Sequence, residues 1–462
     1  MRPEEANKIY FLGIGGIGMS ALARYFRFLG KEVAGYDRSE SRLTQKLIRE
    51  GIPVHFVDDP GVVPAGVDLA VYTPAIPESN EIMTWIRTKG IPLRKRSEIL
   101  GMITKRIPTI AVAGTHGKTT VTAMISHLLS ASGKRCLAFL GGVSKNIDSN
   151  VLLAEDPEFV IVEADEYDRS FLKLFPDIAV VTSVEADHFD IYRNMKNLED
   201  AFRRFAAKPG NKGNALVRAD LLEIFQKPGT PGPLTYSAGP EADFHVKNLR
   251  LTDGKRYLFD LVHPGGVVRD LVPGTPGYFN LENSVAAVSV ALLAGIDGSF
   301  IRRSLETFRG LERRLDFQIE SEKVVYIDDY AHHPTEIDAL VDAVRTIYPE
   351  KRIAGVFQPH LYSRTRDHAV AFAESLENLD VIILLDIYPA REDPIPGVSA
   401  EIIFNKIRSD NKVLCSKSDL IGMLDSLDFD ILLTIGAGDI DRLVPEIRDH
   451  LIRKEKNYEK NS

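Results

Sequence analysis

The chain has 462 residues, of which 44% are hydrophobic, and a formal net charge of −8 at pH 7. That length predicts about three domains with substantial apolar cores, and the acidic charge argues against a nucleic-acid-binding surface, which needs a basic face. With two cysteines and no apolar run long enough for a signal peptide or a membrane span, the sequence predicts a cytoplasmic protein without a disulfide framework, a cysteine-based zinc site or a membrane partner.

Short apolar runs rich in β-branched residues alternate with helical patterns along nearly the whole chain, which is typical of parallel α/β domains. We expect strands at residues 9–12, 32–36, 69–72, 91–94, 107–112, 159–163, 178–183, 324–327, 353–357, 381–385 and 431–435, and a long helix at 281–293. Between residues 229 and 276, short alternating runs separated by Gly and Pro predict a small antiparallel patch. The sequence therefore predicts three α/β domains, at residues 1–106, 107–312 and 313–462.

The first candidate nucleotide site follows the first strand. Residues 13–18 read Gly-Ile-Gly-Gly-Ile-Gly, fit the G-x-G-x-x-G spacing and open a helical pattern over residues 19–28. Asp37 ends the next strand, at the spacing of an acid that binds a ribose. The pattern predicts a diphosphate on a helix N-terminus, which a dinucleotide such as NAD and a UDP group satisfy equally. A glycine turn used only for strand–helix packing is the alternative.

The decapeptide Ala-Val-Ala-Gly-Thr-His-Gly-Lys-Thr-Thr at residues 111–120 is the most informative stretch of the chain. An apolar strand precedes it and apolar residues at helical spacing follow it, which is the order of a phosphate-binding loop. Gly114 and Gly117 let backbone N–H groups approach phosphates, Lys118 can reach the β- and γ-phosphate oxygens, and the Thr119 hydroxyl can bind Mg²⁺. We predict that the chain binds and uses ATP. Two diphosphate sites on one chain favour an enzyme with two substrates.

Acidic residues follow two further strands of the second block. The strand at residues 159–163 ends in Glu163 and runs into Ala-Asp-Glu-Tyr-Asp168, and the strand at 178–183 is followed by Val-Glu-Ala-Asp-His188. A carboxylate at the carboxyl end of a strand beside a phosphate loop is where an Mg²⁺ ligand belongs. Oxygen ligands with one imidazole suit Mg²⁺ or Mn²⁺ better than a structural zinc. Solvated loop acids and helix caps are the alternative for each cluster.

Three polar, aromatic loops follow strands of the third block. Residues 328–334 read Asp-Asp-Tyr-Ala-His-His-Pro, residues 357–366 read Phe-Gln-Pro-His-Leu-Tyr-Ser-Arg-Thr-Arg, and residues 386–392 read Asp-Ile-Tyr-Pro-Ala-Arg-Glu. Because the carboxyl ends of neighbouring parallel strands meet at one edge of a sheet, these loops predict a shared binding site. Packed or solvated histidines and ordinary helix-start charges are the alternative.

Taken together, these motifs resemble the Mur ligases, the ATP-dependent amide ligases that build the peptide of bacterial peptidoglycan. The match covers most of the chain, and its third-block motifs are far more specific than either glycine loop. The resemblance implies a Rossmann-like first domain for a UDP-sugar, a central P-loop domain for ATP, and a Rossmann-like third domain that closes over both and presents an amino acid. It also implies that ATP converts the lactyl carboxylate of UDP-N-acetylmuramate into an acyl phosphate, which L-alanine attacks.

The resemblance assigns roles residue by residue. For ATP it implies the phosphate loop, an Asn-x-x-Asn pair and a ribose-binding acid: Gly114, Thr115, His116, Gly117, Lys118, Thr119, Thr120, Asn280, Asn283 and Asp329. For the UDP-sugar it implies the first glycine loop and its surroundings: Gly13, Gly15, Gly16, Gly18, Met19, Asp37, Ser39 and Thr73. For two Mg²⁺ ions, with Mn²⁺ as a substitute, it implies Thr119, Glu163 and His188. For catalysis it implies Lys118, Tyr330, His332 and Arg364, with His332 as the base for the alanine amine.

Four residues depart from the patterns: Val112 replaces the usual phosphate-loop glycine, Phe279 a common histidine, Ala331 a frequent glycine, and Leu361 an arginine expected to contact the muramoyl carboxylate. Three other functions are compatible with parts of the sequence. One is a ligase of the same fold that attaches a recycled murein peptide to the same sugar nucleotide. The others are an NAD-dependent dehydrogenase built on the first glycine loop and a non-catalytic nucleotide-binding regulator. The sequence fits a monomer and a homodimer equally.

Overall fold

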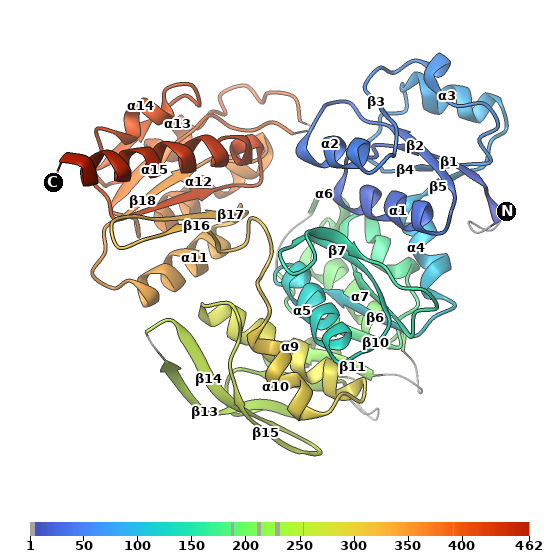
Figure 1. Cartoon of the computed structure of the whole chain (residues 1–462), viewed down its shortest axis with the longest axis horizontal. Coiled ribbons are helices and arrows are strands. Elements are labelled where there is room, and N and C mark those ends of the chain that lie inside the picture. The colour runs from blue at the N-terminus through green and yellow to red at the C-terminus, as the bar shows by residue number, and fades with distance from the viewer. Residues whose placement is uncertain are drawn as a thin grey trace. The chain divides into compact units, whose positions relative to one another are not determined.

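The computed structural model describes residues 5–185, 189–209, 214–226, 232–252, 254–390 and 392–461. Within these ranges the strands form three sheets, joined by helices in the alternating order that the apolar runs predict (Figure 1). The mixed α/β class with three sheets confirms the fold class expected from the sequence. None of the helices in the described part of the chain has both the length and the apolar character that crossing a bilayer requires.

The first sheet is parallel throughout, in the order β3-β2-β1-β4-β5. Its strands are β1 (Lys8–Leu12), β2 (Glu32–Tyr36), β3 (Val54–His55), β4 (Leu69–Tyr72) and β5 (Leu93–Lys95), and its helices are α1 (Ile17–Phe28), α2 (Arg42–Arg49), α3 (Glu81–Thr88) and α4 (Arg96–Thr104). Ile9 and Phe11 belong to one apolar cluster and Tyr10 to another. Both faces of β1 are therefore buried from Ile9 onward, which is why the strand carries large hydrophobic side chains after Lys8. The fifth strand begins two residues later than predicted, after Pro92, which has no N–H to donate.

The second sheet has the order β15-β14-β13-β12-β11-β10-β6-β9-β7-β8. Its strands are β6 (Thr109–Ala113), β7 (Cys136–Ser144), β8 (Ser149–Leu152), β9 (Phe159–Glu163), β10 (Ile178–Val181), β11 (Asn214–Arg218), β12 (Leu234–Ser237), β13 (Phe244–Thr252), β14 (Arg256–His263) and β15 (Gly266–Leu271). Its helices are α5 (Lys118–Ala131), α6 (Phe189–Tyr192), α7 (Met195–Ala206), α8 (Leu222–Phe225), α9 (Tyr278–Leu293) and α10 (Gly298–Glu306). The phosphate-loop strand β6 lies between β10 and β9, with both neighbours parallel to it.

The antiparallel patch predicted between residues 229 and 276 is confirmed, although one strand of the region pairs in parallel. β14 and β15 pair in antiparallel register. β12 pairs in parallel with both β11 and β13, and so extends the main sheet instead of forming a separate layer. A further antiparallel pair, β7 with β8, lies at the opposite edge and was not predicted from the sequence. Alternation of apolar residues marks strands in this region, but partner choice depends on long-range contacts that local pattern does not carry.

The third sheet has the order β16-β17-β21-β18-β19-β20. Its strands are β16 (Asp316–Glu320), β17 (Val325–Asp329), β18 (Ile353–Phe357), β19 (Val381–Leu384), β20 (Lys412–Leu414) and β21 (Ile431–Ile435), and its helices are α11 (Pro334–Ile347), α12 (Tyr362–Leu376), α13 (Glu401–Phe404), α14 (Leu420–Leu424) and α15 (Val444–Asn461). β16 is antiparallel to β17, and the remaining pairs are parallel. The carboxyl ends of β17, β21, β18 and β19 therefore meet at one edge.

The chain divides into two compact units. The first holds Met1–Arg250, Leu258–Thr275 and Asn280–Arg309, and so contains the first two sheets. The second holds Leu251–Tyr257, Pro276–Phe279 and Gly310–Ser462, with the third sheet. A single apolar cluster runs from β1 and α1 to β7, β9 and α7 within the first unit. The boundaries at residues 106 and 312 remain predictions from the sequence.

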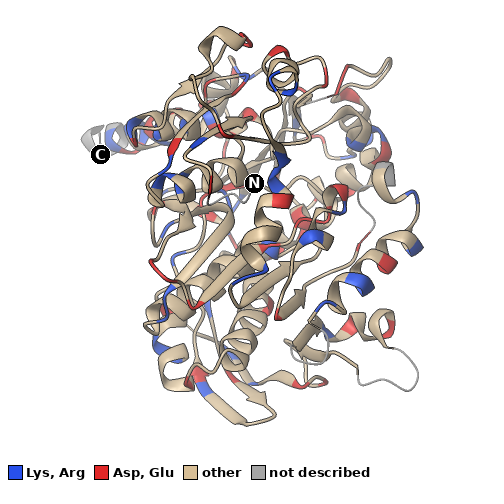
Figure 2. Cartoon of the chain, turned by 90° about the vertical axis from the view of Figure 1, so that its right-hand side faces the viewer, with Lys and Arg blue, Asp and Glu red and all other residues tan. Residues whose placement is uncertain are grey.

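Helix α1 carries a polar contact between the first two sheets. Arg24 Nε lies 2.6 Å from Glu50 Oε2 in the first sheet's domain, and the same guanidinium donates to Asn150 Oδ1 of β8. Asn150 Nδ2 in turn donates to the Ser20 hydroxyl at 2.9 Å. Arg24 has an 8% exposed side chain, and Asn150 is fully buried. Charged residues of both signs are interspersed over the elements seen in Figure 2. The enclosed contact between Arg24 and Asn150 constrains packing more than an exposed ion pair does.

We expect Arg24→Ala to lower the melting temperature, because it leaves the buried Asn150 carboxamide oxygen without its donor. The loss of a partner for one buried polar group costs about 1–3 kcal/mol. The measurement is thermal unfolding followed by circular dichroism. Arg87→Ala is the matched control, since the Arg87–Glu78 pair is 43% and 79% exposed, and its melting temperature should stay near that of the wild type. Equal melting temperatures for the two variants would show that the enclosed contact stabilises the fold no more than the exposed pair does.

Candidate functional site

The phosphate-loop residues lie between β6 and α5. Gly114 has φ 142° and Gly117 has φ 81°, values that favour glycine. A Cβ on Gly114 would lie 2.1 Å from the Thr182 hydroxyl oxygen, and one on Gly117 would lie 2.7 Å from Asn283 Oδ1. The glycines therefore let the loop pack directly on the tip of β10 and on α9. Helix α5 begins at Lys118 with N–H groups that have no acceptor inside the helix, which is the arrangement that binds anions.

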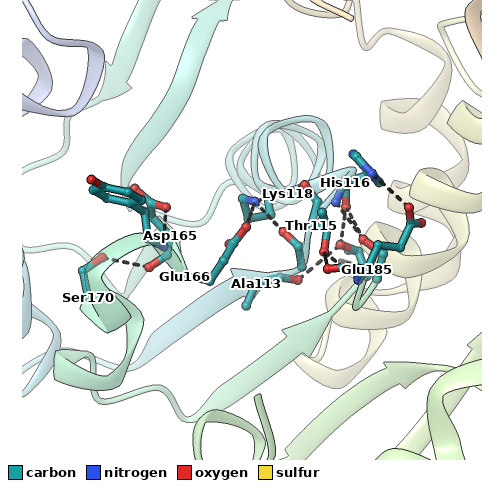
Figure 3. Close-up of polar contacts among 12 residues, drawn as sticks. Ala113, Thr115, His116, Lys118, Asp165, Glu166, Ser170 and Glu185 are labelled. Carbon is teal, nitrogen blue, oxygen red and sulfur yellow. Dashed lines mark hydrogen bonds and ion pairs between the residues drawn. The ribbon is translucent and has the colours of Figure 1, made fainter. Parts of the chain in front are cut away.

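The residues after β10 hold the loop in place. The Thr115 N–H donates to Ser183 O at 3.1 Å, and the His116 N–H donates to the Ser183 hydroxyl at 2.7 Å. The Glu185 N–H donates to the Thr115 hydroxyl at 2.9 Å, and the His116 imidazole lies 3.3 Å from the Glu185 carboxylate (Figure 3). Because the backbone donors of Thr115 and His116 are engaged, phosphate oxygens would be bound by Gly117 and the first turn of α5.

Acceptors surround the Lys118 ammonium. Its Nζ lies 2.9 Å from Glu166 Oε1 and 3.3 Å from Thr115 O, and it also donates to Gly114 O (Figure 3). The side chains of Lys118 and Glu166 are 13% and 4% exposed. Burial lowers the pKa of this ammonium, but the carboxylate of Glu166 and its acidic neighbours outweigh burial, so the pKa of Lys118 is raised. The Glu166 carboxylate therefore favours the charged form of Lys118 in the loop.

Glu163 ends β9 beside the loop. Its Oε2 is buried and has no hydrogen-bond partner in the described part of the chain, and a Cβ on Gly141 of β7 would lie 2.0 Å from it. A buried carboxylate oxygen without a partner is costly unless a cation completes its surroundings. The Glu163 carboxylate oxygen is the kind of ligand that Mg²⁺ prefers. The hydroxyl of Thr119, in the first turn of α5, is a second such oxygen. His188, predicted for a second ion, lies outside the described residues.

Asn280 and Asn283 lie in the first turns of α9. Asn280 is buried, and its Oδ1 lies 3.5 Å from Asn283 Nδ2. The Asn283 carboxamide also lies against Gly117, as the clash of an added Cβ shows. The structure thus brings this pair to the phosphate loop, while Thr120 lies within the first turn of α5 and is half-buried. Contact of the pair with adenine remains a prediction.

The first glycine loop joins β1 to α1. Gly13 has φ 83°, its N–H donates to Tyr36 O at 2.7 Å, and a Cβ on it would lie 2.7 Å from Thr73 Cγ2. Asp37 Oδ2 accepts the Gly15 N–H at 2.7 Å, and its Oδ1 lies 3.4 Å from the Ser39 N–H. The structure therefore brings these predicted residues together around the loop. The Asp37 carboxylate binds the loop itself, and its contact with a ribose remains a prediction.

Helix α1 completes this loop. Gly16 precedes its first residue, and Met19 is buried in the shared apolar cluster. A Cβ on Gly18 would lie 2.6 Å from Arg96 Nη1, so the Arg96 guanidinium lies against the N-terminus of α1. Motif spacing did not identify Arg96, because it belongs to α4, far from the loop in sequence. Only its position two residues after the strand predicted at 91–94 could have drawn attention to it.

The acidic segment after β9 also contacts α4 and β5. Arg96 Nη2 lies 3.5 Å from Asp165 Oδ2, and Lys95 Nζ lies 2.9 Å from Asp168 Oδ2. Asp168 has φ 53° and the next residue φ 52°, which is a strained left-handed pair for side-chain-bearing residues. The segment predicted to carry metal ligands is thus also the segment that joins the second sheet to the first glycine loop.

In the second unit, Tyr330 and His332 follow β17. His332 Nδ1 lies 3.0 Å from Tyr330 O, which can only accept, so Nδ1 carries the proton and Nε2 of the neutral ring carries the lone pair that a base needs. Burial lowers the pKa of His332, Glu336 partly opposes this, and the Arg364 guanidinium lowers the pKa further. Glu336 Oε2 accepts the His332 backbone N–H at 2.9 Å. The imidazole is therefore oriented and held neutral, as a general base requires.

Two arginines that the sequence motifs did not indicate flank this site. Arg313 and Arg314 lie 4.9 Å and 5.1 Å from the Tyr330 ring centroid. The ring of His360, on the next loop, lies 6.0 Å from that of His332 and 5.8 Å from that of Tyr388. The three polar loops of the third sheet therefore meet, as their positions at neighbouring strand ends predict. The two arginines precede β16, where the sequence indicated only a domain boundary.

Asp328 and Asp329 end β17 and are buried. Asp329 accepts the Leu315 N–H at 2.6 Å and the Ala331 N–H at 2.8 Å. Burial raises the pKa of Asp329 to about 6 and that of Asp328 to about 7, although Arg313 partly opposes this for Asp328. Asp329 thus fixes the turn that presents Tyr330, and its contact with the ATP ribose remains a prediction.

Comparison with known proteins gives matches along nearly the whole chain. Family models match residues 8–107 (Mur ligase family, catalytic domain), 112–291 (Mur ligase middle domain) and 313–438 (Mur ligase, glutamate ligase domain). UDP-N-acetylmuramate–L-alanine ligases of Phocaeicola vulgatus and Porphyromonas gingivalis are 44% and 46% identical over 454 and 452 residues, 96% of this chain and 98% and 99% of theirs.

Solved structures show the same fold. The UDP-N-acetylmuramate-alanine ligase of Thermotoga maritima has a TM-score of 0.82 at 24% identity, over 98% of this chain and 100% of that one. A murein peptide ligase of Psychrobacter arcticus has a TM-score of 0.71 at 20% identity, over 96% and 98%. At these identities the structural likeness describes the arrangement of elements and does not select between the two activities.

We expect Asp328→Asn to raise the free energy of unfolding above that of the wild type, and to raise it more at pH 8 than at pH 5. A carboxyl whose pKa is raised by folding contributes stability below its unfolded value of 3.8, and that stability is lost as pH rises toward about 7. The difference in free energy of unfolding between the variant and the wild type should therefore grow by about 2–4 kcal/mol from pH 5 to pH 8. A pKa difference of one between the folded and unfolded states corresponds to about 1.36 kcal/mol. Denaturant unfolding of both proteins at the two pH values measures it. A gain independent of pH would show that Asp328 is ionised throughout.

Proposed function

Because the chain belongs to the Mur ligase family, we propose that it is an ADP-forming ligase that joins L-alanine to the lactyl carboxylate of UDP-N-acetylmuramate in peptidoglycan precursor synthesis. The observation that carries this proposal is the match to curated alanine ligases over nearly the full length of both chains. Two glycine loops at helix N-termini in the first unit support it, because each loop could bind the phosphates of one nucleotide. A dehydrogenase would leave the phosphate loop at Lys118 without a purpose.

The chemistry explains why two nucleotides are needed. A carboxylate is a poor acyl donor, because the amine would have to expel oxide or hydroxide. Transfer of the γ-phosphoryl group of ATP to the lactyl carboxylate forms an acyl phosphate and ADP. Attack by the alanine amine then forms the amide and releases phosphate. Phosphoryl transfer depends mainly on positioning and charge neutralisation, so the loop charge of Lys118 serves the first step.

Glu163 and Thr119 would hold an Mg²⁺ ion, with His188 as the proposed ligand of a second. When bound, such ions neutralise charge on the phosphate oxygens. The buried Glu163 Oε2, which has no hydrogen-bond partner among the described residues, supports this assignment. Lys118 and the N-terminus of α5 would bind the same phosphates from the protein side.

The second step needs a neutral amine, and the third-sheet site fits that requirement. The bond from Nδ1 to Tyr330 O leaves the lone pair of the neutral His332 ring on Nε2, so Nε2 would accept a proton from the alanine ammonium. Arg364 would pair with the alanine carboxylate, since a guanidinium binds a carboxylate with two parallel hydrogen bonds. A ligase for recycled murein peptides is the competing function, and the curated relatives favour free alanine. We propose a cytoplasmic monomer or homodimer.

The function is tested by phosphate release from ATP in the presence of UDP-N-acetylmuramate and a panel of amino acids and murein peptides. We expect release with L-alanine that depends on both nucleotides, and formation of the amide by mass spectrometry. Release with a tripeptide but not with alanine would identify the recycling ligase instead. If none of the amino acids or peptides caused phosphate release, the result would contradict a ligase.

We expect His332→Ala to slow amide synthesis by about 10²–10⁴-fold, the usual contribution of a general base, while acyl-phosphate formation continues. Hydroxylamine trapping of the acyl phosphate, together with positional oxygen exchange in ATP, measures the first step separately. His333→Ala, which changes the half-buried neighbouring histidine, is the control for general disturbance of the loop. If His332→Ala abolished acyl-phosphate formation as well, the histidine would belong to the phosphoryl-transfer step.

A further inference from the structure

No sequence motif assigns a role to Glu166, yet it is the charged partner of the phosphate-loop lysine. An ammonium has three N–H donors, and those of Lys118 point to three acceptors, namely Gly114 O, Thr115 O and Glu166 Oε1 (Figure 3). Two of these acceptors are neutral carbonyls of the loop itself. The third is an anion whose side chain is 4% exposed.

The segment that carries Glu166 is held on both sides of the residue. Its main-chain oxygen accepts the Tyr192 hydroxyl at 2.6 Å. The preceding oxygen, Asp165 O, accepts the Ser170 hydroxyl at 2.8 Å, and Asp165 Oδ1 accepts the Tyr167 N–H at 3.0 Å. Lys118, in contrast, reaches this carboxylate on a flexible four-carbon stem. Glu166 is therefore the fixed member of the pair and Lys118 the adjustable one.

This asymmetry decides what happens when a phosphate enters the loop. If phosphate displaced Glu166 from the ammonium, a buried carboxylate would be separated from its cation beside a second anion, which is strongly unfavourable. If phosphate displaced the carbonyls, two neutral acceptors would be exchanged for a charged one, and Glu166 would keep its partner. The second exchange costs less. The ammonium then lies between the carboxylate and the phosphate.

We propose that Glu166 is a positioning residue for phosphoryl transfer, which holds the Lys118 ammonium in place while its bonds to Gly114 O and Thr115 O are exchanged for phosphate oxygens. This inference rests on the proposed use of ATP at this loop. Glu166 acts through Lys118 and does not touch the substrate. It should therefore affect the rate of phosphoryl transfer more than the affinity for nucleotide.

Glu166→Ala and Glu166→Gln separate these effects. We expect kcat to fall by about 10²-fold in Glu166→Ala, the cost of misplacing a reacting group by about 1 Å. In Glu166→Gln the amide oxygen keeps the bond without the charge, so the fall should be about tenfold. The dissociation constant of ADP, measured by fluorescence titration, should stay within about threefold of the wild type or decrease, because one negative charge beside the phosphates has been removed. If Glu166→Ala does not fold, Glu166→Gln decides.

Two controls isolate the route through Lys118. Glu158→Gln removes the carboxylate of another Lys–Glu pair of the first unit, in which Lys134 Nζ lies 3.1 Å from Glu158 Oε2, and should leave both constants unchanged. The double variant Lys118→Ala, Glu166→Ala should be no slower than Lys118→Ala within about threefold, since the two residues act as one element. The proposal would be overturned if the losses in kcat of the two single variants multiplied in the double variant. It would also be overturned if Glu166→Gln left kcat unchanged.

A crystal structure with ADP or a non-hydrolysable ATP analogue tests the geometry without any turnover. We expect Lys118 Nζ within hydrogen-bond distance of both Glu166 and a phosphate oxygen. An ammonium that has left Glu166 for the phosphate would overturn the inference. This result stands apart from the proposed function, which fails if the wild-type protein makes no amide from alanine.

Discussion

A parallel strand that is buried on both faces offers its polar side chains at or beyond its carboxyl end, because the residues before that end are packed between helices. The proposed chemistry of this protein follows that constraint in all three sheets. The first glycine loop follows β1, the phosphate loop follows β6, and Glu163 closes β9. In the second unit, the loop of Tyr330 and His332 follows β17. Because neighbouring parallel strands end at the same edge, the functional loops of each sheet lie close together.

Within the first unit, one acidic segment serves two sites. Residues 163–168 contain the proposed metal ligand Glu163 and the Lys118 partner Glu166. The carboxylates of Asp165 and Asp168 in the same segment pair with Arg96 and Lys95. Arg96 in turn lies against the N-terminus of α1. The two nucleotide loops are thus connected through a short stretch of chain whose backbone is strained at Asp168. Strain of this kind persists only where the surrounding contacts determine the conformation.

Burial has opposite consequences for the ionisable groups of the third sheet. It keeps His332 neutral and so makes the imidazole available as a base. It raises the pKa values of Asp328 and Asp329, whose oxygens are used by backbone N–H groups and by the Thr434 hydroxyl. The same motif therefore contains a residue suited to proton transfer and two that hold the loop in shape. Residue type alone does not distinguish these roles, whereas hydrogen-bond partners do.

The sequence by itself determined the α/β class, most strand positions, both glycine loops and the meeting of the third-sheet loops, because apolar periodicity and glycine spacing are local properties of the chain. It did not determine that β12 joins the main sheet in parallel, nor that Arg96 reaches the first glycine loop, nor that Arg313 and Arg314 flank Tyr330. The pairing of Glu166 with Lys118 is of the same kind. These features depend on which separate segments pack together, and a contact between residues of different elements leaves no periodic signal in one sequence.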